Sequence, residues 1–251
     1  MSKRISLLLI ALCAAAGIAS ADAEQTPNSF ELFRAQAPEL NPEVLQAALS
    51  ATTCAQRQDE VKRKVLSVID YSLPSTQPRL WVFDLEKREL LFHELVAHGV
   101  NTGENMATRF SNIEGSRQSS LGLFLTDKTY IGRNGYSLKL HGLEEGINHR
   151  ALERTIVLHG AWYVSETFRR EHGRLGRSWG CPAVKKEVAK PLIDTIKDGS
   201  LLFVYYPDQK WLSSSDFLNT CDADSESPPE TASGSQLSPE STGSTSGSSD
   251  K

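Results

Sequence analysis

The stretch 79–97, RLWVFDLEKRELLFHELVA, predicts a β-hairpin and indicates the fold class. It contains two runs rich in β-branched, aromatic and other apolar residues, 79–85 and 89–97, on either side of the charged turn 86–88. Such runs, joined by a short polar turn, are typical of paired strands. Similar runs outward from this hairpin predict further strands at 65–71, 122–125, 137–140, 155–159 and 201–206. The sequence therefore indicates a mainly β domain.

Helices are expected at the periphery of these strands. Asn41 and Pro42 form an N-cap and first-turn signal, after which apolar residues recur at helical spacing to about residue 56. Shorter helices are expected at 165–170 and 185–197. The predicted fold class is mainly β with peripheral helices.

The composition excludes several classes of protein. The chain has 251 residues, 39% of them hydrophobic, which suffices for one globular domain and excludes collagen, a wholly disordered chain and a polytopic membrane protein. It carries 27 Lys and Arg against 31 Asp and Glu. Without segments 1–21 and 222–251 the balance is 24 basic against 25 acidic residues, so no strong basic field attracts nucleic acid.

The N-terminal segment 1–21 has the pattern of a secretory signal peptide. Lys3 and Arg4 precede the apolar run 5–18, and small residues precede a cleavage site before Asp22. An uncleaved membrane anchor is the alternative, but the run is shorter than the roughly 20 residues that span hydrocarbon. We therefore expect an exported protein, periplasmic or extracellular, with no transmembrane segment after cleavage.

The remaining chain divides into three parts. Residues 22–40 are polar and contain two prolines, which predicts a lead-in, and residues 41–221 form the expected domain. The Ser-rich, acidic segment 222–251 has almost no apolar residues and cannot bury enough surface to offset its ordering entropy. We expect a disordered tail.

Cleavage of the signal peptide would leave three cysteines, Cys54, Cys181 and Cys221. In an oxidising compartment this odd number means that at least one thiol is free or paired with another chain. A disulfide between Cys54 and Cys221 would enclose nearly the whole domain and leave Cys181 free, although the sequence does not decide the pairing.

The stretch 156–184, IVLHGAWYVSETFRREHGRLGRSWGCPAV, carries the candidate site. His159 ends a predicted strand, and Cys181 follows 22 residues later in a glycine-flanked turn. A cysteine nucleophile needs a basic partner or positive surroundings, which His159, Arg174 and Arg177 would supply. The alternative is a buried or bridged cysteine beside a core histidine.

Gly180 allows a tight backbone turn in front of Cys181. In such a turn the N–H groups of both residues can point at a developing oxyanion.

The pair His159-Gly160, followed by Ser178-x-Gly180-Cys181, resembles the active-site signature of the YkuD-type murein L,D-transpeptidases. Further similar motifs give a resemblance over about residues 65–206; they are NTG at 101–103, FSN at 110–112, SSLG at 119–122 and LHGLE at 140–144. The resemblance implies a YkuD-like β-sandwich domain whose cysteine attacks an L,D-configured bond in a peptidoglycan stem peptide, releases a terminal D-amino acid and passes the acyl group to an amine. It implies no metal and no organic cofactor.

The same resemblance assigns roles to individual residues. Cys181 is the nucleophile and His159 the base, and the Gly160 carbonyl orients the imidazole. The amides of Gly180 and Cys181 form the oxyanion hole, and Ser178 shapes the turn. Most members of the family carry histidine at the position of Trp179, so here the base must come from elsewhere.

Further residues are candidates for substrate binding. Arg154, Arg174 and Arg177 can receive stem-peptide carboxylates through bidentate hydrogen bonds, or they are ordinary surface arginines. His141 either lines the same cleft or has a structural role in which it bonds to the backbone, and Trp162 and Tyr163 either wall the cleft or belong to the core.

No metal site is expected. His93 and His98 lie five residues apart on one predicted strand, whose period of two sends them to opposite faces.

Three functions remain open. One is an L,D-transpeptidase, another is an L,D-carboxypeptidase that uses the same site with water as acceptor, and the third is a non-catalytic peptidoglycan-binding module.

Overall fold

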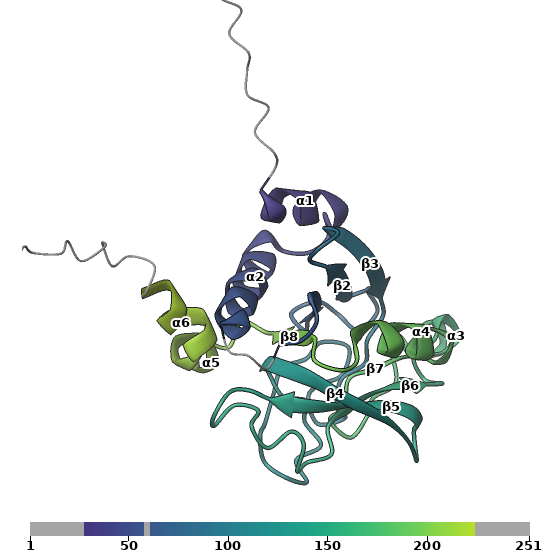
Figure 1. Cartoon of the computed structure of the whole chain (residues 1–251). Coiled ribbons are helices and arrows are strands. Elements are labelled where there is room, and N and C mark those ends of the chain that lie inside the picture. The colour runs from purple at the N-terminus through teal and green to yellow at the C-terminus, as the bar shows by residue number, and fades with distance from the viewer. Residues whose placement is uncertain (1–27, 58–60, 224–251) are drawn as a thin grey trace, which may run out of the picture.

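A computed structural model describes residues 28–57 and 61–223. Eight strands form one continuous sheet in the order β3-β2-β1-β8-β4-β5-β6-β7, and the helices lie outside it (Figure 1). The strands are β1 Val65–Asp70, β2 Leu80–Asp84, β3 Glu89–Glu94, β4 Gly122–Gly132, β5 Gly135–Gly142, β6 Val157–Ala161, β7 Ala183–Lys185 and β8 Leu201–Tyr205. The helices are α1 Ser29–Gln36, α2 Pro42–Gln56, α3 Glu166–His172, α4 Lys186–Ile196, α5 Gln209–Ser214 and α6 Asp216–Ala223. The predicted mainly β class with peripheral helices is confirmed, in a sheet that curves almost into a barrel.

The central strands are buried, and most of their side chains are apolar on both faces. Every residue of β1 is buried, as are four of the five residues in each of β2 and β8. Burial of such side chains contributes roughly 1.5–3 kcal/mol each relative to exposure. β8 pairs parallel with β1 and antiparallel with β4, so the last strand of the chain joins the two halves of the sheet.

The predicted hairpin forms from β2 and β3, with Leu80 opposite Glu94. The second strand is shorter than expected, because the chain leaves the sheet after Glu94. The expectation that His93 and His98 share one strand is therefore wrong. His93 stacks on Trp81 with ring centroids 4.9 Å apart, whereas His98 is buried in the segment that follows β3.

Strands β4 and β5 are longer than the sequence indicated. β4 continues to Gly132 and turns into β5, with Gly132 paired to Gly135. Gly135 has a φ of +76°, a backbone conformation that glycine adopts without steric cost. Polar, largely exposed residues fill this extension, so the run of apolar residues that signals a buried strand is missing there.

Helix α1 lies within the segment that we expected to be a lead-in. Asn28 caps the helix by accepting the N–H of Phe30, and Phe33 packs on Phe83 with ring centroids 5.0 Å apart. Phe33 and Leu40 are both buried, so the folded unit begins before residue 41. Helix α2 has the predicted start, with Asn41 as N-cap and Pro42 in the first turn.

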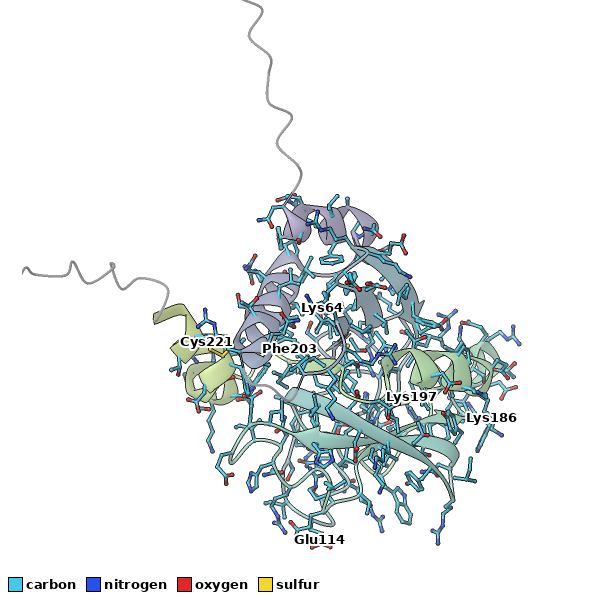
Figure 2. The ribbon with its side chains drawn as sticks, viewed as in Figure 1. Lys64, Glu114, Lys186, Lys197, Phe203 and Cys221 are labelled. Carbon is cyan, nitrogen blue, oxygen red and sulfur yellow. A yellow bond between two sulfur atoms is a disulfide. The ribbon has the colours of Figure 1, made fainter. Side chains whose placement is uncertain are left out.

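Helices α5 and α6 continue the fold after the last strand, where the sequence predicted no element. Trp211 and Phe217 are buried there. Cys221 of α6 forms a disulfide with Cys54 of α2, and their Cα atoms lie 5.6 Å apart (Figure 2). This is the pairing that leaves Cys181 as a free thiol.

The expected signal peptide lies outside the described residues, as does the expected tail from residue 224 onward. Within residues 28–57 and 61–223, we find no helix with the length and apolar character that crossing a bilayer requires.

Candidate active site

Parallel pairing of β6 with β7 brings the two motif residues together. Their register places His159 opposite Ala183, two residues beyond Cys181. The N–H of His159 also donates to the Pro182 carbonyl over 3.4 Å. Cys181 and His159 consequently line the same cavity, of about 580 Å³. Its other walls are Tyr130, Arg133, Asn134, Arg154, Thr155, Val157, Tyr163, Arg177, Ser178 and Trp179.

The Cys181 side chain is a buried thiol at the wall of this cavity, with 9% of its surface exposed. Burial raises its pKa, against smaller opposing effects from the Val157 N–H, the charge of Arg154 and its own N–H. The Sγ donates a hydrogen bond to the Thr155 carbonyl over 3.7 Å. The resting side chain is therefore protonated at neutral pH and needs a base to become a thiolate.

Thr155, whose carbonyl accepts this hydrogen bond, has an unusual backbone. Its φ is +54°, a region that β-branched residues rarely adopt. Such conformations are retained where the surrounding structure forces them, often at functional sites.

His159 has the protonation state that a base requires. Its Nδ1–H donates to the Gly160 carbonyl over 3.1 Å, which leaves the lone pair on Nε2. Burial lowers the pKa of the imidazole, partly opposed by that hydrogen bond, so the ring is neutral at pH 7.

Gly160 allows the backbone of β6 to approach α4 closely. A Cβ at this position would lie 2.8 Å from the Cβ of Ala189 and 3.2 Å from the Cα of Lys186. A side chain there would separate β6 from α4 and displace the neighbouring His159.

Ser178 closes the turn that presents the thiol. Its Oγ accepts the N–H of Gly180 at 3.1 Å and donates to the Cys181 carbonyl at 2.5 Å. Gly180 has a φ of +122°, and a Cβ on it would lie 2.9 Å from the Gln118 carbonyl oxygen, so no other residue fits.

The predicted oxyanion role of Gly180 needs correction. Its N–H is already donated to the Ser178 Oγ, so in this structure it is not free to stabilise an oxyanion as expected. The N–H of Cys181 has no acceptor among residues 28–57 and 61–223, and it remains the available donor.

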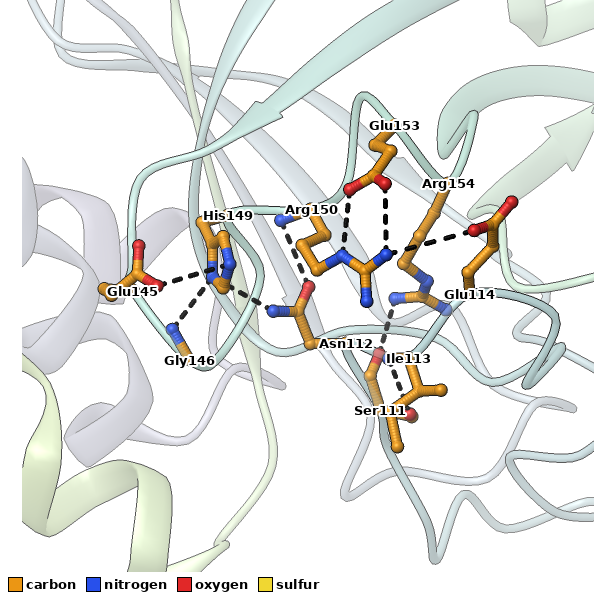
Figure 3. A network of polar contacts seen from close by, with 10 residues as sticks. All are labelled: Ser111, Asn112, Ile113, Glu114, Glu145, Gly146, His149, Arg150, Glu153 and Arg154. Atoms are coloured by element: carbon orange, nitrogen blue, oxygen red, sulfur yellow. Dashed lines mark hydrogen bonds and ion pairs between the residues drawn. The ribbon is translucent and has the colours of Figure 1, made fainter.

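Arg154 lines the cavity, but most of its donors are engaged. Its two terminal nitrogens donate to four acceptors in the loop 111–120, and Figure 3 shows the contact with the Ser111 carbonyl. Its predicted role as a carboxylate receptor is therefore not supported by the geometry. Its positive charge instead lowers the pKa of Cys181.

Arg174 and Arg177 both bind Glu104, which the sequence analysis did not identify. Arg174 Nε lies 2.9 Å from one carboxylate oxygen, and Arg177 Nη1 lies 2.7 Å from the other. Of these two arginines, only Arg177 lines the cavity of Cys181. Glu104 offsets one of their two positive charges, and Arg154 is the arginine whose charge opposes the rise in the pKa of Cys181 that burial causes.

His141 does not reach the candidate site. It lines a separate cavity of about 670 Å³, where its Nε2 lies 3.0 Å from Asp127 Oδ2. The partner of His141 is thus a carboxylate, and not the backbone group that the structural alternative predicted.

The tryptophans near the motif are exposed. Trp179 has 68% of its surface exposed, lines the cavity of Cys181 and stacks under Arg117, whose Cζ lies 4.6 Å from the ring centroid. Trp162, 67% exposed, lines a second cavity of about 600 Å³ that also contains His159 and Tyr163. Tyr163 belongs to both cavities, so His159 and Tyr163 stand between them.

Three wall residues come from the end of the β4–β5 hairpin, Tyr130, Arg133 and Asn134. They were not predicted, because the strand expected at 122–125 ends before this hairpin turn. The signal that could have found them is Asn134-Gly135, a dipeptide typical of tight hairpin turns.

Metal-binding side chains are not grouped in the part of the chain that the structure describes. No cluster of three or more His, Cys, Asp or Glu residues in 28–57 and 61–223 has the arrangement to hold a metal ion.

The protein-family model described as the L,D-transpeptidase catalytic domain, YkuD_2, matches residues 36–205. The chain belongs to this family. The match includes Cys181, His159 and every other wall residue of their cavity.

Solved structures that match this chain include several L,D-transpeptidases at low identity, and the chain spans less than two thirds of the length of the first of them. An L,D-transpeptidase from Mycobacterium smegmatis is 13% identical, with a TM-score of 0.36 over 57% of this chain and 59% of that one. One from Stackebrandtia nassauensis is 15% identical, with a TM-score of 0.34 over 72% and 77%. The helical cell shape determining protein Pgp2 from Campylobacter jejuni is 10% identical, with a TM-score of 0.39 over 73% and 58%. Assignment to the L,D-transpeptidase family rests on the sequence match.

A search of curated proteins found no match.

Proposed function

We propose that the protein is a cysteine-dependent L,D-transpeptidase that acts on peptidoglycan stem peptides. The observation that carries the proposal is the placement of a free Cys181 and a neutral His159 in one cavity of a domain of this family. A non-catalytic wall-binding module would need neither residue.

The first half of the reaction follows from the protonation states. His159 Nε2 accepts the Sγ proton of Cys181, and the sulfur attacks the carbonyl carbon of the L,D-configured bond. The Cys181 N–H stabilises the resulting oxyanion. The C–N bond then breaks, the D-amino acid leaves with the proton from His159, and a thioester on Cys181 remains.

The second half repeats these steps with a new nucleophile. An acceptor amine attacks the thioester and gives its proton to His159, which returns it to the departing sulfur. Transfer to an amine forms a crosslink, whereas attack by water would give the carboxypeptidase product.

Two wall residues are suited to bind the stem peptide. Arg177 uses only Nη1 in its contacts with the described residues, which leaves Nη2 for a carboxylate. The exposed ring of Trp179 offers an apolar surface beside Cys181.

We further propose that the protein is exported. The signal-peptide pattern of residues 1–21 and the disulfide between Cys54 and Cys221 support an oxidising compartment, as expected for a periplasmic or extracellular protein.

The test is incubation with purified disaccharide-tetrapeptide, followed by mass analysis of the products. Crosslinked dimers indicate transfer, and disaccharide-tripeptide without dimers indicates the carboxypeptidase. Unchanged substrate would contradict the proposal and support the binding module.

A further inference from the structure

The segment 96–100, which follows β3, contacts both ends of the turn 178–183 that carries Cys181. We call it the bracing segment. At one end, Ala97 and Ala183 exchange two backbone hydrogen bonds of 2.8 and 3.3 Å. At the other end, the Ser178 N–H donates to the His98 carbonyl over 3.0 Å, and the Val100 N–H donates to the Ser178 carbonyl over 2.8 Å. The position of the turn therefore depends on the position of this segment.

The middle of the bracing segment also touches the turn. A Cβ on Gly99 would lie 2.8 Å from the Cα of Gly180 and 2.5 Å from the Arg117 carbonyl oxygen. Ser119 joins the two glycines, because its Oγ accepts the Gly99 N–H at 3.0 Å and donates to the Gly180 carbonyl at 2.9 Å. The two backbones therefore pack directly on each other, with no room for a side chain at position 99.

Arg79, next to the start of β2, anchors the bracing segment from inside the protein. Its side chain is fully buried, and its Nε and Nη2 donate to the Val96 carbonyl over 3.1 and 2.9 Å. Nη2 also lies 2.8 Å from His98 Nδ1, and Nη1 donates to the Leu73 carbonyl over 2.7 Å. The guanidinium thus fixes a backbone group and a side chain of the same segment.

The contact with Arg79 determines the tautomer of His98. A guanidinium can only donate, so Nδ1 of His98 is the acceptor and the ring proton is on Nε2, 3.3 Å from the Gly103 carbonyl. Burial, followed by the charge of Arg79, lowers the pKa of His98 to about 3. His98 is therefore a neutral ring that joins Arg79 to the loop at Gly103.

His98 is outside the cavity of Cys181 and has only 1% of its surface exposed, so it has no route to the substrate. Its backbone carbonyl accepts the Ser178 N–H, so a displacement of His98 would move the turn that carries Cys181. Ser178 in turn bonds the Cys181 carbonyl.

We propose that His98, held by Arg79, is a positioning residue that sets the place of the Cys181 sulfur through the bracing segment and Ser178. The inference rests on the proposed function, since it assigns His98 a part in that reaction. The competing explanation is a buried polar network that only stabilises the fold.

The principal variant is His98→Ala, which removes the acceptor of Arg79 and frees the bracing segment to shift. Misplacement of a reacting group by about 1 Å can reduce the rate by about 10²-fold, so we expect kcat to fall by that order with KM little changed. His98→Asn keeps an acceptor near the position of Nδ1 and should restore most of kcat.

A matched control is Thr126→Val, at another fully enclosed hydrogen-bonding position. Thr126 Oγ1 donates to the Ile196 carbonyl at 2.6 Å and accepts the Ser200 N–H at 2.9 Å, away from the cavity of Cys181. We expect this variant to melt at a lower temperature and to keep the wild-type kcat.

Alkylation of Cys181 by iodoacetamide provides a readout that does not require turnover. In His98→Ala the thiol of Cys181 should leave its buried position and react at least about 10-fold faster than in the wild type. The rates are compared at a temperature where every variant is fully folded, and Thr126→Val should react at the wild-type rate. If His98→Ala does not fold, Ser119→Ala removes the link between Gly99 and Gly180 and should show the same pair of changes.

These two readouts separate the two proposals. If the wild type does not turn over stem peptides, the proposed function fails, while the alkylation rates still test the bracing segment. The positioning role is overturned if the folded His98→Ala or Ser119→Ala variant melts at a lower temperature but has the same alkylation rate as Thr126→Val. It is also overturned if the kcat of His98→Asn is no higher than that of His98→Ala.

Discussion

Removal of the disulfide between Cys54 and Cys221 should destabilise the domain strongly. The two residues are 167 positions apart in the chain and join α2 to α6, so the bridge restricts nearly the whole unfolded domain. In the chain-entropy model a closed loop of this length contributes about 5 kcal/mol. For a domain of this size each kcal/mol shifts Tm by about 2–4 °C, and we expect a fall of about 10–20 °C.

The assay is thermal unfolding followed by circular dichroism, with and without a reductant. Cys54→Ala/Cys221→Ala should unfold at the temperature of the reduced wild type, and a reductant should not change its Tm, because Cys181 is unpaired. Two results would refute the reasoning: a fall of less than about 4 °C on reduction, or peptide mapping that finds Cys181 in the disulfide.

Three further predictions concern the site. The rate of Cys181 alkylation should rise with pH through a pKa above the ordinary thiol value, because burial raises it; a midpoint below that value would contradict the burial argument. His159→Ala should lower kcat by at least about 10²-fold without unfolding the domain, and unchanged turnover of this variant would exclude His159 as base. In the wild type, kcat/KM should fall at acid pH with a midpoint below the ordinary histidine pKa, because burial lowers the pKa of His159. Trp179→His should keep kcat within about 10-fold of the wild type, since Trp179 supplies no base, and should raise KM, because its exposed ring is proposed to bind the stem peptide; a complete loss of kcat would contradict the assignment of the base to His159.

The parts of the fold that follow from local sequence patterns were predictable. The charged turn between two apolar runs identified the β2–β3 hairpin, and Asn41 with Pro42 identified the start of α2. Helix α1 was missed because it has only eight residues, four of them polar, and buries Phe33 alone. The outer half of β4 was missed because none of its residues from Asp127 to Gly132 is buried.

The candidate site was predictable as a pair of residues but not as a network. Strand-end and turn signals picked out His159 and Cys181, and parallel pairing of β6 with β7 brings them to one cavity. The partners of the arginines depend on how distant loops fold, and no local pattern places Glu104 beside Arg174 and Arg177.

No local sequence pattern predicted the hydrogen bond between Gly180 and Ser178 either. A serine two positions before a glycine can point outward or back to the turn, and the choice depends on the contact with the bracing segment. We therefore predicted two amides for the oxyanion, those of Gly180 and Cys181, whereas the Gly180 amide is already engaged.

The most direct test of a cysteine nucleophile is to detect the acyl-enzyme itself. The wild type and Cys181→Ala are mixed with excess disaccharide-tetrapeptide, quenched in acid and examined by intact-protein and peptide mass spectrometry. We predict that the wild type gains the mass of one disaccharide-tripeptide acyl group on the peptide that contains Cys181, and that folded Cys181→Ala gains none and forms no product. Continued product formation by Cys181→Ala, or an adduct located on another residue, would contradict the account.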